Sequence, residues 1–185
     1  MTFKYQLLEN ERIHLTLLLD DDMTPLAQWL SDFNLQRLAN PGVLMPMTAQ
    51  DLLAPESWMS ADRNSPNSYI FAIRVKKKND FIGVVALSNI NSQARHAAFG
   101  INIAHPDYRG QGYGQEATKT MLRYGFLELN LNRIWLDVFS YNERAIRLYE
   151  NVGFVHEGRE REMIYRDGQY HDSIKMGILR REWKK

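Results

Sequence analysis

Apolar residues recur along this chain with two periods, and each period predicts a different kind of element. Spacings of three and four residues predict helices over 23–30, 112–129 and 143–152, the last between Asn142 as N-cap and Gly153 as C-cap. Alternating apolar residues and short apolar runs predict strands over 12–19, 69–76, 81–89, 97–104, 133–139, 154–165 and 170–179. Several prolines interrupt residues 32–67, which predicts short helices and loops there, with one helix within 49–59.

The order of these elements and the lengths of their connections indicate the fold class. Two short polar connections, 76–80 and 89–95, join the three strands between 69 and 104, which predicts an antiparallel meander. The turn Arg166-Asp167-Gly168 predicts a hairpin at the end of the chain. We therefore expect one α+β domain over residues 1–185. Its mixed, mostly antiparallel sheet would have about seven strands flanked by helices, unlike a repeating βαβ array.

Composition and charge narrow the classes of function. The 185 residues include 23 basic and 22 acidic side chains, and this balance gives no support for binding to nucleic acid or to a membrane surface. There is no cysteine, which excludes disulfides, a thiolate nucleophile and cysteine-based zinc sites. The five histidines show no metal-ligand spacing, so we expect no metal. The sequence shows no signal-peptide pattern or membrane-length apolar run, and we expect a cytoplasmic protein.

The stretch YRGQGYGQEA, residues 108–117, places three glycines at alternate positions in front of the longest predicted helix. Glycine costs about 0.5–1 kcal/mol relative to alanine in regular structure, so three of them indicate a need for bare backbone. Successive backbone N–H groups and a helix N-terminus together form a cradle for an anion such as pyrophosphate. Side chains at positions 110, 112 and 114 would block the ligand. Gln111 and Tyr113 would point away, and Arg109 would add charge and anchor the loop.

Two other interpretations of this stretch stay open: a flexible loop before a helix, and a dinucleotide-binding turn. Gly112, Gly114 and Ala117 match the dinucleotide fingerprint G-x-G-x-x-[GA], and Asp137 follows at the distance of a ribose-binding acid. However, seven residues, 105–111, separate the preceding strand from the first fingerprint glycine, where a tight turn is expected. The predicted hairpins upstream also disfavour a dinucleotide-binding fold.

Two segments resemble the signatures of a known protein family. Residues 109–114 (RGQGYG) are similar to the [QR]-x-x-G-x-[GA] signature of the GCN5-related N-acetyltransferases (GNAT), and residues 142–154 (NERAIRLYENVGF) resemble the family segment N-x-x-A-x-x-x-Y-x-x-x-G-F. The predicted element order also fits, so the resemblance covers nearly the whole chain. Trp29, Leu30, Asp32 and the stretch YRDGQYHDSI look like the ribosomal-protein N-terminal acetyltransferase (RimJ/RimL-type) branch. Residues 96–179 are also similar to spermidine acetyltransferases.

The resemblance implies transfer of an acetyl group from acetyl-coenzyme A (acetyl-CoA) to a primary amine. The acceptor would be a protein N-terminus, a polyamine or a small-molecule amine, held between residues 25–60 and the final hairpin. The resemblance implies donor-binding roles for Ile101, Asn102, Ile103, Arg109, Gly110, Gln111, Gly112, Tyr113, Gly114 and Asn142. The alternative role of Asn102 is that of a solvated residue on the face of its strand. The alternative role of Asn142 is that of a helix cap. Because this family often dimerises, we also expect a homodimer.

Tyr149 is the candidate catalytic residue, since the resemblance places the tyrosine that protonates the leaving thiolate at this motif position. Packing on the apolar stripe of its helix is the alternative. No general base is identified, because Ala98 stands where this branch often has a glutamate. Asp32, His96, Asp137 and Glu143 are alternatives, as is an amine that arrives neutral or loses its proton through water. The missing carboxylate motivates a second hypothesis, a non-catalytic acyl-CoA-binding or sensing module; a dinucleotide-binding domain is the third.

Overall fold

A computed structural model describes residues 7–184 of the chain. Its elements in chain order are β1 (Ile13–Thr16), η1 (Asp20–Asp22), α1 (Met23–Leu30), α2 (Phe33–Gln36), α3 (Ala49–Leu53), α4 (Trp58–Asn64), β2 (Tyr69–Val75), β3 (Asp80–Asn91), β4 (His96–Ile103), η2 (Pro106–Tyr108), α5 (Tyr113–Leu127), β5 (Arg133–Phe139), α6 (Glu143–Val152), β6 (Val155–Arg166) and β7 (Gln169–Leu179). Within 7–184, no helix has the length and apolar character to cross a membrane.

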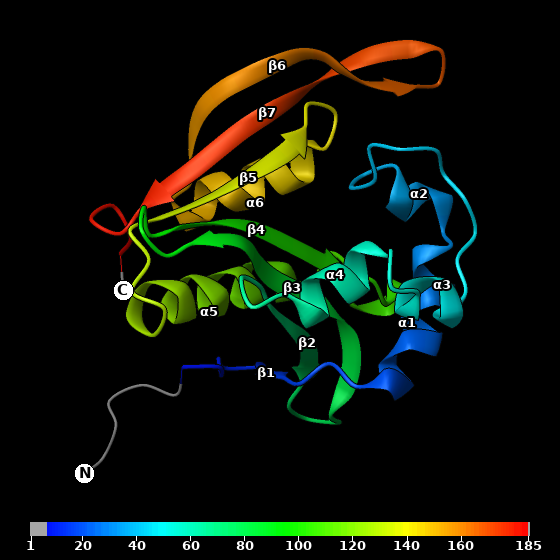
Figure 1. Ribbon diagram of the computed structural model, residues 1–185, viewed down its shortest axis with the longest axis horizontal. Helices are drawn as coiled ribbons and strands as arrows, with labels where there is room; N and C mark the ends of the chain where they lie inside the picture. The colour runs from blue at the N-terminus through cyan, green and yellow to red at the C-terminus, as the bar shows by residue number, and fades with distance from the viewer. Residues whose placement is uncertain (1–6, 185) are drawn as a thin grey trace.

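The strands form one seven-stranded sheet in the order β1-β2-β3-β4-β5-β7-β6. All neighbours pair antiparallel except β4 and β5, which are parallel. The predicted α+β class, the meander from β2 to β4 and the mixed, mostly antiparallel sheet are therefore confirmed. The β6–β7 hairpin extends beyond β5 as a long curved arm, and its tip approaches the segment that follows α2 (Figure 1).

Helices cover both faces of the sheet, and each face has its own core. On one face, Met121, Leu122 and Phe126 of α5 pack with strand residues that include Ile73 and Val85. On the other face, the apolar side chains of α1, α3 and α4 pack with Ala72, Val84 and Ala104. Adjacent residues such as Ala72 and Ile73 belong to different cores because successive side chains on a strand point to opposite faces.

The first strand is shorter than its apolar pattern predicts. The expected strand covers 12–19, whereas β1 pairs with β2 only over Ile13–Thr16. After Thr16 the chain leaves the sheet edge and enters η1, and the side chains of Leu17 and Leu19 are 75% and 52% exposed. Their apolar character reflects neither strand pairing nor a place in the core.

The helical content predicted for the proline-rich region is divided between short elements. The helix expected within 49–59 is confirmed as α3, and α4 follows it after a turn that contains Pro55. Each of the two helices begins at its own capping hydroxyl, Thr48 or Ser57, whose side-chain oxygen accepts a backbone N–H three residues on. Proline disfavours helical backbone in the residue before it, and α3 ends just before that point.

The predicted helix ends and the hairpin turn near the C-terminus are confirmed. The Asn142 side chain accepts the backbone N–H of Ala145 at 3.2 Å, and Gly153 ends α6 with φ +107°. Asp167 and Gly168, with φ +52° and +79°, form the tight turn between β6 and β7. Positive φ at both central residues suits the twist of a two-residue hairpin.

Candidate functional site

A pocket opens where β4 and β5 separate. Their parallel pairing covers only His96–Ala98 against Arg133–Trp135, and the later residues of both strands line the gap. The pocket has a volume of about 560 Å³, and α2, α6 and the loop before α5 complete its walls. Among the described strands, β4 has no partner on this side beyond Ala98, so the backbone groups that face this side, apart from the Ile103 carbonyl bound by Arg109, are available to an extended ligand.

The glycine loop forms one end of this pocket. Gly110 and Gly112 have φ values of +80° and +87°, which side chains rarely tolerate, and both line the pocket. Gly112 is the N-cap of α5, so the first N–H groups of a 15-residue helix point out of this end. This arrangement provides the backbone donors and the positive dipole end that an anion requires.

The third glycine of the stretch has a different reason from the one predicted. Gly114 also lines the pocket, but a Cβ there would lie 3.2 Å from Cδ1 of Leu148 and 3.7 Å from Cγ1 of Ile103. A side chain at this position would therefore press on α6 and β4. Close packing of α5 against its neighbours accounts for this glycine without a ligand.

The loop is held in place by Arg109. Its guanidinium donates hydrogen bonds to the carbonyls of Ile103 (3.2 Å) and Ala104 and to the carboxylate of Asp32 (3.0 Å). The same contact with Arg109 holds the pKa of Asp32 below its ordinary value. Arg109 thus ties the loop to the end of β4 and to the N-cap of α2, which is the anchoring role expected from the sequence.

Gln111 and Tyr113 lie outside the pocket lining, as expected for side chains that point away from the ligand. The Gln111 side chain donates to the carbonyl of Asp107. The Arg12 guanidinium lies over the ring of Tyr113, and its carbon Cζ is 4.4 Å from the ring centroid. Both side chains stabilise the outer surface of the loop, and only their backbone groups remain for a ligand.

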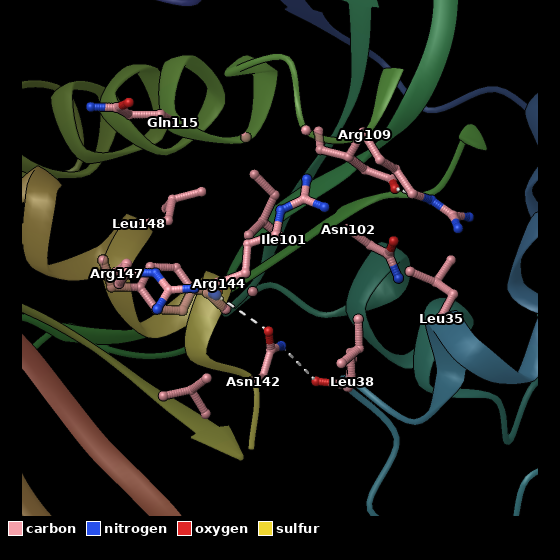
Figure 2. A pocket seen from close by; sticks show the side chains of 18 of the residues that line it. Leu35, Leu38, Ile101, Asn102, Arg109, Gln115, Asn142, Arg144, Arg147 and Leu148 are labelled. Carbon is pink, nitrogen blue, oxygen red and sulfur yellow. Dashed lines mark hydrogen bonds between the residues drawn. The ribbon is translucent and has the colours of Figure 1, made fainter. Parts of the chain in front are cut away.

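Two arginines of α6 enter the pocket, and the sequence analysis did not single them out. Figure 2 shows Arg144 reaching from α6 toward Ile101, with Arg147 one turn further along the helix. Arg147 forms an exposed ion pair with Glu143 at 3.0 Å, whereas Arg144 makes no ion pair within residues 7–184. The sequence does contain a signal for these two arginines. They lie three residues apart on the helix that carries Tyr149, and therefore on one side of it, next to the apolar stripe of that helix.

Tyr149 lines the pocket from α6 and is also largely buried, with 9% of its surface exposed. Its ring lies edge-on to Phe99 at 6.1 Å between centroids and contacts Phe154 at 5.7 Å. Burial raises the pKa of its phenol to about 12, so the hydroxyl keeps its proton throughout the neutral range. Tyr149 therefore packs in the core and also lines the pocket.

The side chains considered as general bases either form ion pairs or lie away from the pocket. Asp137 lines the pocket, and its carboxylate accepts a hydrogen bond from Lys175 at 2.9 Å. Asp32 pairs with Arg109, and Glu143 pairs with Arg147. His96 lies at the opposite end of β4, where that strand still pairs with β5. Ala98 stands where this branch often has a glutamate. It also lies in the paired part of β4, and its side chain offers no carboxylate.

Two asparagines of the pocket differ in how their side chains are bonded. Asn142 caps α6 and donates from Nδ2 to the carbonyl of Leu38 at 3.2 Å, which joins α6 to the segment after α2 (Figure 2). Asn102 lies on β4, and its Oδ1 is buried without a hydrogen-bond partner among the described residues. A buried, unpaired acceptor is uncommon and costs about 1–3 kcal/mol.

Groups of three or more side chains suited to metal binding are absent from residues 7–184. The pocket carries three arginines against one aspartate, Asp137. The charged and backbone groups gathered at the glycine loop and α6 therefore suit an anionic ligand.

Comparison with known proteins identifies the family. Residues 12–155 match the sequence model of the acetyltransferase (GNAT) domain. The chain is 39% identical over 113 residues to the spermidine N(1)-acetyltransferase of Vibrio cholerae, an alignment that covers 61% of this chain and 64% of that protein. It is 34% identical over 113 residues to the SPbeta prophage-derived uncharacterized N-acetyltransferase YokL of Bacillus subtilis, covering 60% of this chain and 63% of the relative. The chain therefore matches less than two thirds of the length of these relatives.

The fold matches over a longer span. The crystal structure of spermidine N-acetyltransferase from Vibrio cholerae in complex with CoA and spermine superposes with a TM-score of 0.82 at 28% identity, covering 94% of this chain and 98% of that one. The family match extends over most of the sheet, the glycine loop and α6. The chain belongs to the GNAT acetyltransferase family.

Proposed function

We propose that this protein is an acetyl-CoA-dependent N-acetyltransferase that moves an acetyl group to a primary amine by direct attack. One observation carries the proposal: the glycine loop, the guanidinium of Arg144 and the phenol of Tyr149 line a single pocket at the separation of β4 and β5. Family membership and the neighbouring structure that contains CoA support the same assignment.

In this proposal the glycine-loop end receives the phosphates of the donor. Backbone N–H groups from Gly110 to Gly114 hold the pyrophosphate, and Arg144 and Arg147 neutralise phosphate charge. Ile101, Asn102 and Ile103 flank the pantetheine arm, whose amides pair with the open edge of β4 in the manner of an added strand. Arg109 anchors the loop, while Asn142 fixes the start of α6.

The chemical step forms a bond from the amine nitrogen to the thioester carbonyl carbon and breaks the carbon–sulfur bond. The leaving thiolate takes one proton, and the nitrogen loses one. Tyr149 is the proton donor to sulfur, since its buried phenol is protonated at neutral pH, and solvent reprotonates it. Because the nearby acids are paired, the amine arrives neutral or loses its proton to water rather than to a dedicated base.

The test is a thiol-release assay with acetyl-CoA and a panel of primary amines. We expect amine-dependent release of one free thiol per acetylated product. Calorimetric measurement of acetyl-CoA binding tests the second hypothesis, a non-catalytic acyl-CoA-binding module. The specific reason for that hypothesis is Ala98, which lacks the expected carboxylate. Tight binding of acetyl-CoA with no thiol release from any amine would favour that module. Stabilisation by NAD and not by acetyl-CoA in a thermal-shift assay would favour the dinucleotide alternative.

Three finer expectations remain predictions: membership of the RimJ/RimL-type branch, a homodimer and a cytoplasmic location. The match to spermidine acetyltransferases supports an amine acceptor without deciding the branch. Light scattering on the purified chain tests the dimer, and a mass near twice the 21.7 kDa of one chain is the expected result.

A further inference from the structure

The two faces of β4 divide the pocket into sides of different character. Ile101 and Ile103 pack toward the core that contains α5, on the side of the glycine loop and Arg144. Asn102 has the opposite orientation, shared with Ala104, which belongs to the core of α1, α3 and α4. Figure 2 shows this division: the Asn102 amide lies toward Leu35 and Leu38 of the α2 region, whereas Ile101 lies toward Arg144 and Leu148.

On this second side, Asn102 supplies an unused hydrogen-bond acceptor. Its Oδ1 is buried and has no partner within residues 7–184, although the residue lines the pocket. The neighbouring wall is apolar and comes from Leu35, Leu38, Ala39 and Phe139. A ligand that donates one N–H to Asn102 and packs an apolar group against this wall would satisfy both features.

The charge of the pocket argues against a ligand with several positive charges. Arg109, Arg144 and Arg147 line it, and the single lining carboxylate, Asp137, is held by Lys175 at 2.9 Å. Asp32 is held by Arg109. Arg144 and Arg147 are assigned to the donor phosphates, so the described lining offers no unpaired carboxylate to the further ammonium groups of a polyamine, and these charges would be desolvated without a partner.

We propose, on the basis of the proposed function, that the acceptor is a monoamine with an apolar substituent, and that Asn102 Oδ1 positions it by accepting one of its N–H groups. Asn102 thus flanks the pantetheine arm through its backbone alone, and its side chain positions the acceptor. The inference separates this chain from its spermidine-acetylating relatives in substrate class. The apolar monoamine is either a small molecule or the N-terminus of a peptide.

The experiment measures steady-state thiol release from acetyl-CoA with phenethylamine, with a tripeptide amide that begins with phenylalanine, and with spermidine. We expect kcat/KM for one of the two monoamines to exceed that for spermidine by about tenfold or more, and the better of the two identifies the source of the amine. A higher kcat/KM for spermidine than for both monoamines would overturn the inference while leaving the transferase intact. No thiol release from any amine would overturn the transferase and this inference together.

Two variants test the role of Asn102. Asn102→Leu keeps the approximate volume and removes the acceptor, so the KM for the preferred monoamine should rise about tenfold with kcat little changed. Asn102→Asp keeps an oxygen at this position and should restore the KM, while its charge shifts preference toward spermidine. The calorimetric Kd for acetyl-CoA should stay within about twofold in both variants. A higher Kd for acetyl-CoA in Asn102→Leu with an unchanged amine KM would assign the residue to the donor and overturn the inference.

Discussion

At the scale of single residues, Gly112 joins two requirements of the donor site. Its φ of +87° turns the chain into α5, and a Cβ there would lie 3.1 Å from a guanidinium nitrogen of Arg12, which binds the loop. Gly114, two residues on, meets a packing requirement against Leu148 instead. Equal spacing in the sequence thus combines two physical causes, and substitutions at the two positions should have different effects.

Gly112→Ala should raise the Kd for acetyl-CoA about tenfold or more, because it strains the loop at its positive φ and presses a methyl group on the Arg12 guanidinium, which binds Gln111 and Glu116 and so holds the loop at the start of α5. Isothermal titration calorimetry measures the change. Gly168→Ala is the matched control, since Gly168 has a similar φ of +79° but open space around it and lies at the hairpin turn. An equal loss of affinity in both variants would mean that general destabilisation, and not the loop, explains the effect.

Tyr149→Phe should lower kcat by about tenfold to a hundredfold and leave the Kd for acetyl-CoA unchanged, since only the proton donor is removed. The ring remains to pack on Phe99 and Phe154, which preserves the core. Steady-state thiol-release assays at a saturating concentration of amine give kcat. Turnover at the wild-type rate would remove Tyr149 from the chemical step and leave it the packing role alone.

The same residue predicts an alkaline effect on stability. Burial raises the pKa of Tyr149 from the ordinary 10.0 to about 12, so between these values the unfolded chain loses the proton and the folded chain keeps it. The free energy of unfolding therefore falls as pH rises in this window, by about 1 kcal/mol at pH 11 relative to pH 9. Urea denaturation at both pH values should show a smaller fall in Tyr149→Phe. Tyr170→Phe, at an exposed phenol, should keep the wild-type fall.

At the scale of elements, the sequence predicted most of what the structure contains. The strands from 69 to 179 and the two long helices follow from apolar periodicity, since their pairing and burial depend on local alternation. The ends of α6 were predictable because Asn142 and Gly153 have defined capping chemistry. Residues 12–19 were overpredicted because exposed Leu17 and Leu19 resemble strand residues in sequence. The pocket position of Arg144 and the buried Oδ1 of Asn102 depend on how strands and helices meet in space, which a periodic pattern does not encode.

The β6–β7 hairpin holds the segment after α2 against the pocket. Arg166 donates to the carbonyls of Asn40 and Gly42, and Arg37 forms an ion pair with Asp167 at the turn. Tyr141 donates to the carbonyl of Arg37 from the end of β5. This segment supplies Leu38 and Ala39 to the pocket wall, so a distant hairpin shapes the side of the pocket assigned to the acceptor.

Arg166→Ala should therefore raise the KM for the preferred amine about fivefold, because the released segment no longer presents a fixed wall, while the Kd for acetyl-CoA stays the same. The measurement is initial-rate kinetics with each substrate varied in turn. Arg161→Ala changes an exposed residue of the same hairpin and serves as the control with wild-type kinetics. A raised Kd for acetyl-CoA with an unchanged amine KM would show that the hairpin serves the donor side instead.

At the scale of the whole molecule, the donor loop lies between the two cores. Arg109 binds the carbonyls of Ile103 and Ala104, which belong to the two different cores, and it also binds Asp32 at the start of α2. The loop therefore depends on both halves of the fold. Lysine preserves the charge at this position but lacks the planar fork needed to make the three contacts together.

Arg109→Lys should accordingly raise the Kd for acetyl-CoA about tenfold. Asp32→Asn, which keeps a capping oxygen for α2, should have a smaller effect at neutral pH. Because Arg109 lowers the pKa of Asp32, this ion pair is complete above the ordinary carboxyl range and is lost as the pH falls through the lowered pKa. Since pH 4 lies above the ordinary aspartate value of 3.8, the ion pair persists there, and the ratio of the Kd of Asp32→Asn to that of the wild type should be the same at pH 7 and pH 4, as measured by calorimetry. A ratio that falls to one at pH 4 would mean that Asp32 is already protonated there, and that the carbonyl contacts of Arg109 alone then join the donor site to the two cores.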